Sequence, residues 1–196
     1  MILQSFKNRF EMLKKEGNNI QYVLDIGAYR GDFTETVKLV WPTCIVRQIE
    51  ADDRQKQYLQ NDAIISLLGD EVKESVEFFT LPEDQVTTGS SIFKEMTAYY
   101  TDAIIMKKQM DTIDNLNKTH NFYGNWKEHG LIKLDTQGSE LMIVDGGKDF
   151  IASREVRYIL IECSIVEYNK DSPRLIEVVK KMDERSEEHT SELQSH

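Results

Sequence analysis

The stretch "VLDIGAYRGDFTETVKLVW", residues 23–41, decides the fold of this chain. Its first residues are apolar, favour a buried strand and lead into Asp25. Two glycines, Gly27 and Gly31, follow, and apolar residues then recur at helical spacing until Pro42 ends the pattern. A strand, a glycine turn and a helix in this order form the opening unit of a doubly wound α/β sheet.

The same alternation continues on both sides of this unit. We expect an amphipathic helix over residues 2–13, strands over 20–27, 44–50, 63–70, 131–135 and 156–164, and helices over 32–41, 53–61, 139–147 and 172–184. Ser172 is expected to cap the last helix, with Pro173 at its first position. Strands that alternate with helices predict one α/β domain, a mostly parallel sheet between two helical layers.

Composition limits the classes of function. The chain has 196 residues, of which 40% are hydrophobic and 30% charged, as in one globular domain. Its formal charge of -10 argues against nucleic acid as a partner, and its apolar runs are too short to span a membrane. We therefore expect a cytoplasmic protein that acts on a small molecule. Cys44 and Cys163 lie in apolar runs and are predicted to be buried reduced thiols, not metal ligands.

The last residues, 185–196, differ from the rest of the chain. "RSEEHTSELQSH" has no aromatic residue and no periodicity, so composition predicts a disordered acidic tail. The segment also resembles the translation of an adapter used in sequencing libraries. We therefore expect the domain to be residues 1–184, with a foreign tail in place of a longer natural C-terminus.

The region between Glu71 and Thr119 is less regular, with short strands expected over residues 75–81 and 103–110 and an insertion from Leu81 to Met110. Its polar and aromatic linking stretch fits two interpretations. It is either a lid or substrate-selecting loop beside a site, or a surface excursion.

The turn at residues 27–31 predicts a ligand site, because ligands of doubly wound sheets bind where the first strand turns into its helix. A dinucleotide site prefers GxGxxG, whereas this chain has GAYRG, and a carboxylate at Asp25 would repel a pyrophosphate. The same carboxylate suits an ammonium or a sulfonium. Glu50 ends the second predicted strand, from which a carboxylate can accept both hydroxyls of a ribose. S-adenosylmethionine, a cationic nucleoside that carries an amino acid, meets these demands.

Three segments resemble the FkbM-type methyltransferases. These are "VLDIGAYRGDFT", "QIEADD" and, most specifically, "LIKLDTQGSELMIVDGG" at residues 131–147, which matches the family pattern IKxDxxGxE. The resemblance covers residues 22–184 and implies a Rossmann-like class I methyltransferase fold with strand order 3-2-1-4-5. It also implies a terminal antiparallel hairpin after Glu184. Without that hairpin, the strand around Ile159 is expected to be an uncovered edge.

The resemblance implies methylation of a hydroxyl on a sugar, glycan or natural product, with S-adenosylmethionine as cofactor. No metal is expected, because a sulfonium is already activated for methyl transfer. We predict that the following residues bind the cofactor: Asp25, Gly27, Ala28, Tyr29, Arg30, Gly31, Thr34, Glu50 and Ala51. Asp135 and Glu140 are the candidate catalytic residues. For two of these residues a structural role stays open, since Asp25 can hold the turn and Glu140 can cap its helix.

Other polar residues near these motifs are less favoured. Lys133 alternates with apolar neighbours and is expected to reach solvent, while His120 and His129 are possible general bases that are more often plain surface residues. Two further classes of function remain open. One is an NAD(P)-dependent oxidoreductase, which the GAYRG turn disfavours, and the other is a catalytically inactive cofactor-binding module.

Overall fold

The computed structural model describes residues 3–82, 85 and 87–194, with side chains described as far as Glu184. Its centre is a five-stranded sheet in the order β3-β2-β1-β7-β8, and all of its pairings are parallel. The strands are β1 (Tyr22–Ile26), β2 (Ile45–Glu50), β3 (Ile64–Ile65), β7 (Gly130–Leu134) and β8 (Tyr158–Ile161). This arrangement confirms the predicted α/β class and the 3-2-1-4-5 strand order.

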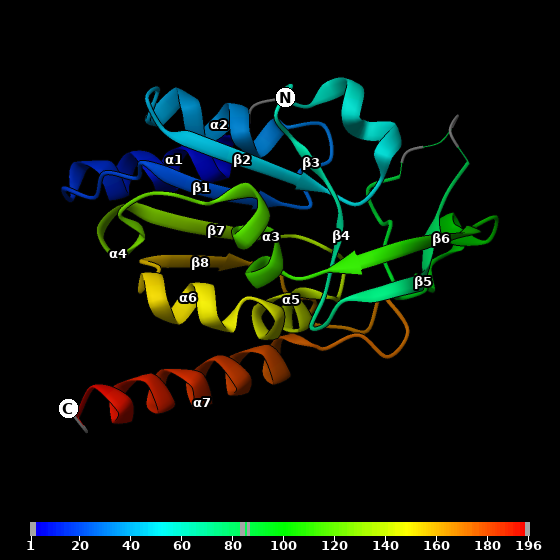
Figure 1. The fold of residues 1–196 in the computed structure, drawn as a ribbon. Helices are drawn as coiled ribbons and strands as arrows, with labels where there is room; N and C mark the ends of the chain where they lie inside the picture. The colour runs from blue at the N-terminus through cyan, green and yellow to red at the C-terminus, as the bar shows by residue number, and fades with distance from the viewer. Residues whose placement is uncertain (1–2, 83–84, 86, 195–196) are drawn as a thin grey trace.

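Helices cover both faces of the sheet and complete three layers (Figure 1). The first face is covered by α1 (Gln4–Lys15) and α2 (Asp32–Val40), and the second by α3 (Ile113–His120), α5 (Glu140–Gly146) and α6 (Lys148–Arg154). Successive side chains of a strand point to opposite faces. Val23 and Leu131 therefore pack in the α1–α2 layer, whereas Leu24 and Ile132 pack in the other layer.

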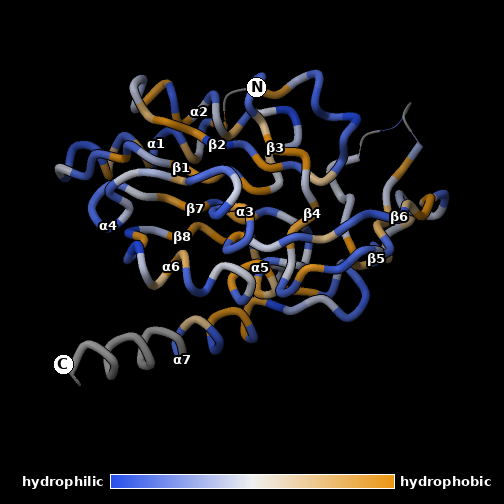
Figure 2. The backbone as a smooth tube through the Cα atoms, viewed as in Figure 1, coloured by the Kyte–Doolittle hydropathy of each residue, from blue (hydrophilic) through white to orange (hydrophobic). Residues whose placement is uncertain are grey.

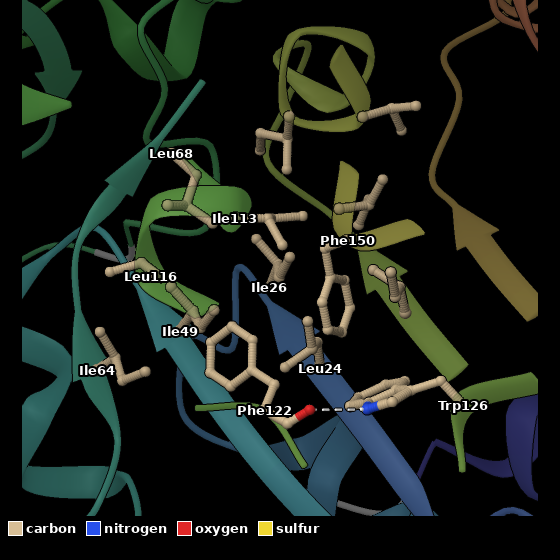
Figure 3. Packing of buried hydrophobic residues seen from close by; sticks show 14 residues of the cluster. Leu24, Ile26, Ile49, Ile64, Leu68, Ile113, Leu116, Phe122, Trp126 and Phe150 are labelled. Carbon is tan, nitrogen blue, oxygen red and sulfur yellow. Dashed lines mark hydrogen bonds between the residues drawn. The ribbon is translucent and has the colours of Figure 1, made fainter. Parts of the chain in front are cut away.

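Aromatic side chains fill the core on the second face (Figure 3). The rings of Trp126 and Phe150 meet edge to face with centroids 5.2 Å apart, and Phe122 packs against Phe150 in the same way. Trp126 Nε1 donates to the carbonyl oxygen of Phe122 at 3.1 Å, so the indole N–H is satisfied although it is buried. Hydrophobic residues concentrate along the central strands (Figure 2). This packing fixes the ends of β1 and β7, where the candidate site lies.

A smaller sheet stands beside the carboxyl ends of the central strands (Figure 1). It has the order β4-β6-β5, built from β4 (Leu67–Leu68), β5 (Lys73–Thr80) and β6 (Ile104–Asp111). The antiparallel pair β5–β6 confirms the two short strands expected in this region. The chain between them contains the 3-10 helix η2 (Ala98–Tyr100).

Several local predictions were wrong. The helix expected over 53–61 is a 3-10 helix, η1 (Asp53–Tyr58), and the strand expected over 63–70 divides into β3 and β4 at Ser66. The strand expected over 156–164 is only the four residues of β8. The helix expected over 139–147 is confirmed as α5, but α6, which follows it directly, was not predicted. Neither α3 nor the short α4 (Trp126–His129) was predicted.

The last helix, α7 (Leu175–Gln194), also begins later than predicted. Ser172 does not cap it, because its hydroxyl donates to the carbonyl oxygen of Asn169 at 2.8 Å. The backbone of residues 185–194 continues α7, while residues 195 and 196 lie outside the described chain. The foreign origin of this segment stays a prediction. Among the described residues no strand follows β8, which is therefore an edge strand.

Candidate active site

A cavity of about 1190 Å³ opens at the carboxyl ends of β1, β2, β7 and β8. Its wall includes the turn after β1, the first residues after β2 and β7, a segment from Thr87 to Tyr100, and the loop from Glu162 to Asn169. Ligand pockets in proteins usually measure about 300–1,000 Å³. The cavity is therefore large enough for two ligands side by side, and it lies where doubly wound sheets bind them.

Most of the predicted site residues lie on this wall. The wall includes Gly27, Ala28, Tyr29, Arg30, Glu50, Ala51 and Asp135, but not Asp25, Gly31, Thr34 or Glu140. Three of the absent residues, Asp25, Thr34 and Glu140, support the wall from behind, as described below. Gly31 has a φ of +82°, and its N–H donates to the carbonyl oxygen of Ala28 at 2.8 Å. The expectation that Asp25 and Thr34 touch a ligand directly is not supported by their positions, because both side chains are buried beneath the wall.

The turn after β1 needs glycine at position 27 for two reasons. Gly27 has a φ of +73°, and a Cβ there would lie 1.8 Å from the carbonyl oxygen of Asp135. The end of β1 therefore passes the end of β7 more closely than any side chain allows. Tyr29 also has a positive φ, 49°, and its ring and that of Tyr58 both lie beside the Arg30 guanidinium. The turn is thus held by its close approach to β7 at Gly27 and by the contacts of Arg30 with the two rings.

Glu50 presents a buried carboxylate to the cavity. Its Oε2 accepts from the backbone N–H of Tyr29 at 2.7 Å, and its Oε1 accepts from the N–H of Asp52 at 2.8 Å. Only 8% of the residue is exposed. Burial raises the pKa of Glu50, although the two amide hydrogen bonds oppose the rise. The oxygens are therefore held in place, and each keeps a lone pair for a further donor.

Asp25 belongs to a polar row that crosses three strands under α2. The register pairs Asp25 with Gln48 on β2 and with Lys133 on β7, so the three side chains point to the same face. Thr34, in the first turns of α2, donates to Asp25 Oδ2 at 2.7 Å and accepts from Gln48 Nε2 at 3.0 Å. Asp25 is fully buried. Its role in this structure is to hold the row together.

Lys133 is the cation of this row, and the expectation that it reaches solvent was wrong. Helices cover both faces of the sheet and β7 is a central strand, so the side chain is only 8% exposed. Its Nζ donates to the carbonyl oxygen of Gly27 at 2.7 Å and lies 3.4 Å from both Asp25 Oδ1 and Asp135 Oδ2. Burial opposes its charge, but Asp25 and Asp135 outweigh that effect and raise its pKa.

Asp135 follows β7 and shares a hydrogen-bond donor with a second carboxyl group, that of Glu162. Gln137 Nε2 donates to Asp135 Oδ1 at 3.1 Å and to Glu162 Oε2 at 2.8 Å. Both carboxyl groups and Gln137 line the cavity. Two acidic side chains thus meet on the wall beside the end of β7.

Glu140 holds the loop between β7 and α5. Its Oε1 accepts from the N–H and the hydroxyl of Thr136, and its Oε2 accepts from the N–H of Gly138 at 2.9 Å. Only 6% of the residue is exposed, and it is absent from the cavity wall. This geometry favours a structural role for Glu140, as the residue that holds the loop before α5, over a catalytic one.

The segment from Thr87 to Tyr100, here called the wall segment, closes one side of the cavity. Ser91 Oγ donates to the carbonyl oxygen of Gln137 at 2.9 Å, and the N–H of Met96 donates to the carbonyl oxygen of Tyr168 at 2.8 Å. Glu95 also forms an isolated antiparallel bridge with Asn169. Of the two interpretations of this region, the position of the segment favours the loop beside a site.

The remaining candidates lie elsewhere or carry little chemistry. His129 precedes β7 at the opposite edge of the sheet, where its Nδ1 lies 2.8 Å from the carbonyl oxygen of Asn19, and His120 is not on the cavity wall. Both cysteines are free; Cys44 is buried, but Cys163 is half-buried on the wall. Within the described residues, no three acidic, histidine or cysteine side chains are grouped to hold a metal ion.

Sequence reasoning missed Gln137, Glu162 and the central position of Lys133. Glu162 could have been found, because it directly follows the apolar run 158–161 of a predicted strand, just as Asp135 ends the strand predicted over 131–135. Gln137 carries no such signal. Its amide reaches two carboxyl groups only because the loop after β7 turns back at Gln137, whose φ is +57°.

The fold is an α/β sheet with a cavity at its strand ends, and comparison with known proteins identifies the class. The Methyltransferase FkbM domain matches residues 25–192. The chain belongs to the FkbM methyltransferase family, which confirms the resemblance noted in the sequence and assigns the sheet to a methyltransferase fold.

A solved structure, methyltransferase FkbM from Methylobacillus flagellatus KT, shares 18% sequence identity with this chain. The similarity covers 70% of this chain but 31% of that one, with a TM-score of 0.42. No curated protein matches the chain significantly. None of the described helices is long and apolar enough to cross a membrane.

Proposed function

We propose that the protein transfers a methyl group from S-adenosylmethionine to a hydroxyl group of a sugar, glycan or other hydroxylated natural product. Membership of the FkbM methyltransferase family supports the reaction class. The observation that carries the choice of cofactor is the carboxylate of Glu50, held by two backbone amides on the cavity wall. The acceptor class and a cytoplasmic location stay predictions from the sequence.

Glu50 and its neighbours fit the nucleoside part of this cofactor. Each Glu50 oxygen retains a lone pair, so the carboxylate can accept from both hydroxyls of a ribose. Gly27 and Ala28 bring backbone without bulky side chains to the same wall.

The charge of the wall fits a cationic ligand. Acidic residues on the described wall are Asp32, Glu50, Glu95, Asp135 and Glu162, while the basic ones are Arg30 and Lys133. Lys133 lies 3.4 Å from each of two carboxylates, which offset its charge. An excess of carboxylates attracts a sulfonium and repels the pyrophosphate of a dinucleotide.

The bound cofactor would supply a methyl group that its sulfonium has already activated for displacement. The chain itself then has two tasks, which are to align the acceptor oxygen and to remove one proton. Asp135, which lies beside the turn that Gly27 forms, is suited to orient the polar groups of a ligand in the cavity.

Calorimetric titration with S-adenosylhomocysteine and with NADH tests this proposal. We expect S-adenosylhomocysteine to bind and NADH not to bind. The substitution Glu50→Gln should weaken binding about tenfold, equivalent to about 1.4 kcal/mol, because one acceptor oxygen is lost. The matched control Glu77→Gln changes an exposed carboxylate that pairs with Lys107 and should bind like the wild type.

Two results would contradict the proposal. Binding of NADH without binding of S-adenosylhomocysteine would favour the oxidoreductase. Binding of S-adenosylhomocysteine without methyl transfer to any member of a panel of hydroxylated acceptors would favour the inactive cofactor-binding module.

A further inference from the structure

The side-chain amide of Gln137 joins the carboxyl groups of Asp135 and Glu162 on the cavity wall. Its Nε2 lies 3.1 Å from Asp135 Oδ1 and 2.8 Å from Glu162 Oε2. The carboxyl groups come from different strand ends, since Asp135 follows β7 and Glu162 follows β8. Two acidic groups that share one amide in this way bind a common proton more readily than they both ionise.

Lys133 makes the two carboxyl groups unequal. Its ammonium lies 3.4 Å from Asp135 Oδ2, on the side away from Gln137. Burial opposes ionisation of Asp135, but hydrogen bonding with Glu162 and the charge of Lys133 hold its pKa below the ordinary value. Asp135 is therefore the member of the pair that stays ionised.

Glu162 is the member that holds a proton. Hydrogen bonding with Asp135, partial burial and the charges of Asp135 and Glu140 raise the pKa of Glu162 to about 8, against the opposing charge of Lys133. Cys163, the next residue, has a thiol whose pKa burial also raises, so it adds no charge beside Glu162 near neutral pH. A base works best when its pKa lies near the working pH.

The backbone holds this pair in position at the cavity. The N–H of Glu162 donates to the carbonyl oxygen of Leu134 at 2.9 Å, which ties the end of β8 to the end of β7. The carbonyl oxygen of Gln137 accepts from Ser91 of the wall segment and from Asn169. The Glu162 side chain is exposed to the cavity and can therefore reach a ligand there.

Two buried glutamates and the two histidines considered from the sequence are less suitable for proton removal. Glu140 accepts hydrogen bonds from Thr136 and Gly138 behind the wall, and Glu50 accepts from two backbone amides at the far side of the turn. His120 and His129 are absent from the wall.

We propose that Glu162 is the general base of the methyl transfer, with Gln137 and the Lys133–Asp135 pair as the groups that position it and prepare it. This inference rests on the proposed function. The hydroxyl O–H bond of the acceptor breaks and its proton passes to the Glu162 carboxylate. The acceptor oxygen uses the released electron pair in its new bond to the methyl carbon, and the carbon–sulfur electron pair stays on sulfur as a neutral thioether.

A test that needs no acceptor is the titration of glutamate carboxyl carbons by NMR. The wild type should show one glutamate that titrates near pH 8, and this signal should be missing in Glu162→Gln. In Asp135→Asn the same glutamate should titrate at lower pH, because its partner charge is gone. A wild type in which no glutamate titrates above about pH 6 would overturn the proposal.

Kinetics then test the role in the reaction. Glu162→Gln should lower kcat by about 10²–10⁴-fold and remove the rise of kcat with pH, and Glu162→Asp should recover part of the rate. The matched control Glu167→Gln alters an exposed carboxylate of the same loop, absent from the cavity wall, and should keep the wild-type profile. Thermal unfolding checks that each variant folds.

The results separate the two proposals. If the wild type does not bind S-adenosylhomocysteine, the proposed function fails, whereas the carboxyl titration still decides whether Glu162 holds the proton. If the wild type binds it and Glu162→Gln retains the rise of kcat with pH, only the assignment of Glu162 fails. If the rise of kcat with pH is retained in Glu162→Gln but lost in Asp135→Asn, the general base is Asp135 instead.

Discussion

The two sides of the cavity are built in different ways. On one side lies the polar row of Gln48, Asp25 and Lys133, three neighbours across paired strands whose positions follow from the strand register. On the other side lies the wall segment, which is held by hydrogen bonds between neutral groups, such as that of Ser91 to Gln137 and that of Met96 to Tyr168. The row is thus held by buried charged side chains, whereas the wall segment is held by hydrogen bonds between neutral groups.

Loss of the cation should have the largest effect, because the row depends on it. Lys133→Met leaves Asp25 as a buried carboxylate without its cation, and such a change costs about 3–5 kcal/mol. Chemical denaturation measures the loss. The double variant Asp25→Asn/Lys133→Met should recover about 1–3 kcal/mol of it, because the two charges are coupled. Additive losses would show that Asp25 and Lys133 do not act as a pair.

The close approach of β1 and β7 should have the next largest effect. Gly27→Ala puts a Cβ 1.8 Å from the Asp135 carbonyl oxygen and also strains a residue with φ of +73°. The left-handed conformation costs about 1–2 kcal/mol and the overpacking adds roughly 1–3 kcal/mol.

Gly17 provides the matched control, since its φ is +90° but a Cβ there would meet nothing within 4 Å. Gly17→Ala should therefore cost only the conformational part, about 1–2 kcal/mol. Equal losses in the two variants would show that the strand ends can move apart.

The same comparison explains which features the sequence could predict. The strand order, the glycine turn and the wall positions of Glu50 and Asp135 follow from local patterns that the parallel sheet repeats. The burial of Lys133 does not follow from a local pattern. A lysine between apolar residues looks like an exposed position until the strand register places Asp25 beside it. The position of the wall segment could not be predicted for a related reason, since its partners Gln137 and Tyr168 are far from it along the chain.

Removal of one hydroxyl from each side should give a smaller difference. Thr34→Val removes a donor to the charged Asp25 and should cost about 1.5–3 kcal/mol, whereas Ser91→Ala removes a donor to a neutral carbonyl and should cost about 0.5–1.5 kcal/mol. Unfolding in denaturant measures both. Ser91→Ala should also speed proteolytic cleavage within residues 87–100, and Thr34→Val should not. The reverse pattern would mean that the wall segment, and not the row, is the more firmly held side.

The pH dependence of stability reports on the carboxyl pair between the two sides. Because the pKa of Glu162 is raised to about 8 from a model-peptide value of 4.5, the native state binds more protons than the unfolded state between these values. The contribution of Glu162 to stability is therefore complete below about pH 4.5 and falls as the pH rises to about 8. Glu162→Gln removes this contribution, so its free energy of unfolding relative to that of the wild type should rise over the same interval. Denaturation of both proteins at several pH values measures the difference. A difference that does not change with pH would mean that the Glu162 carboxyl group titrates alike in the folded and unfolded chains, and that Asp135 and Gln137 do not hold a proton on it.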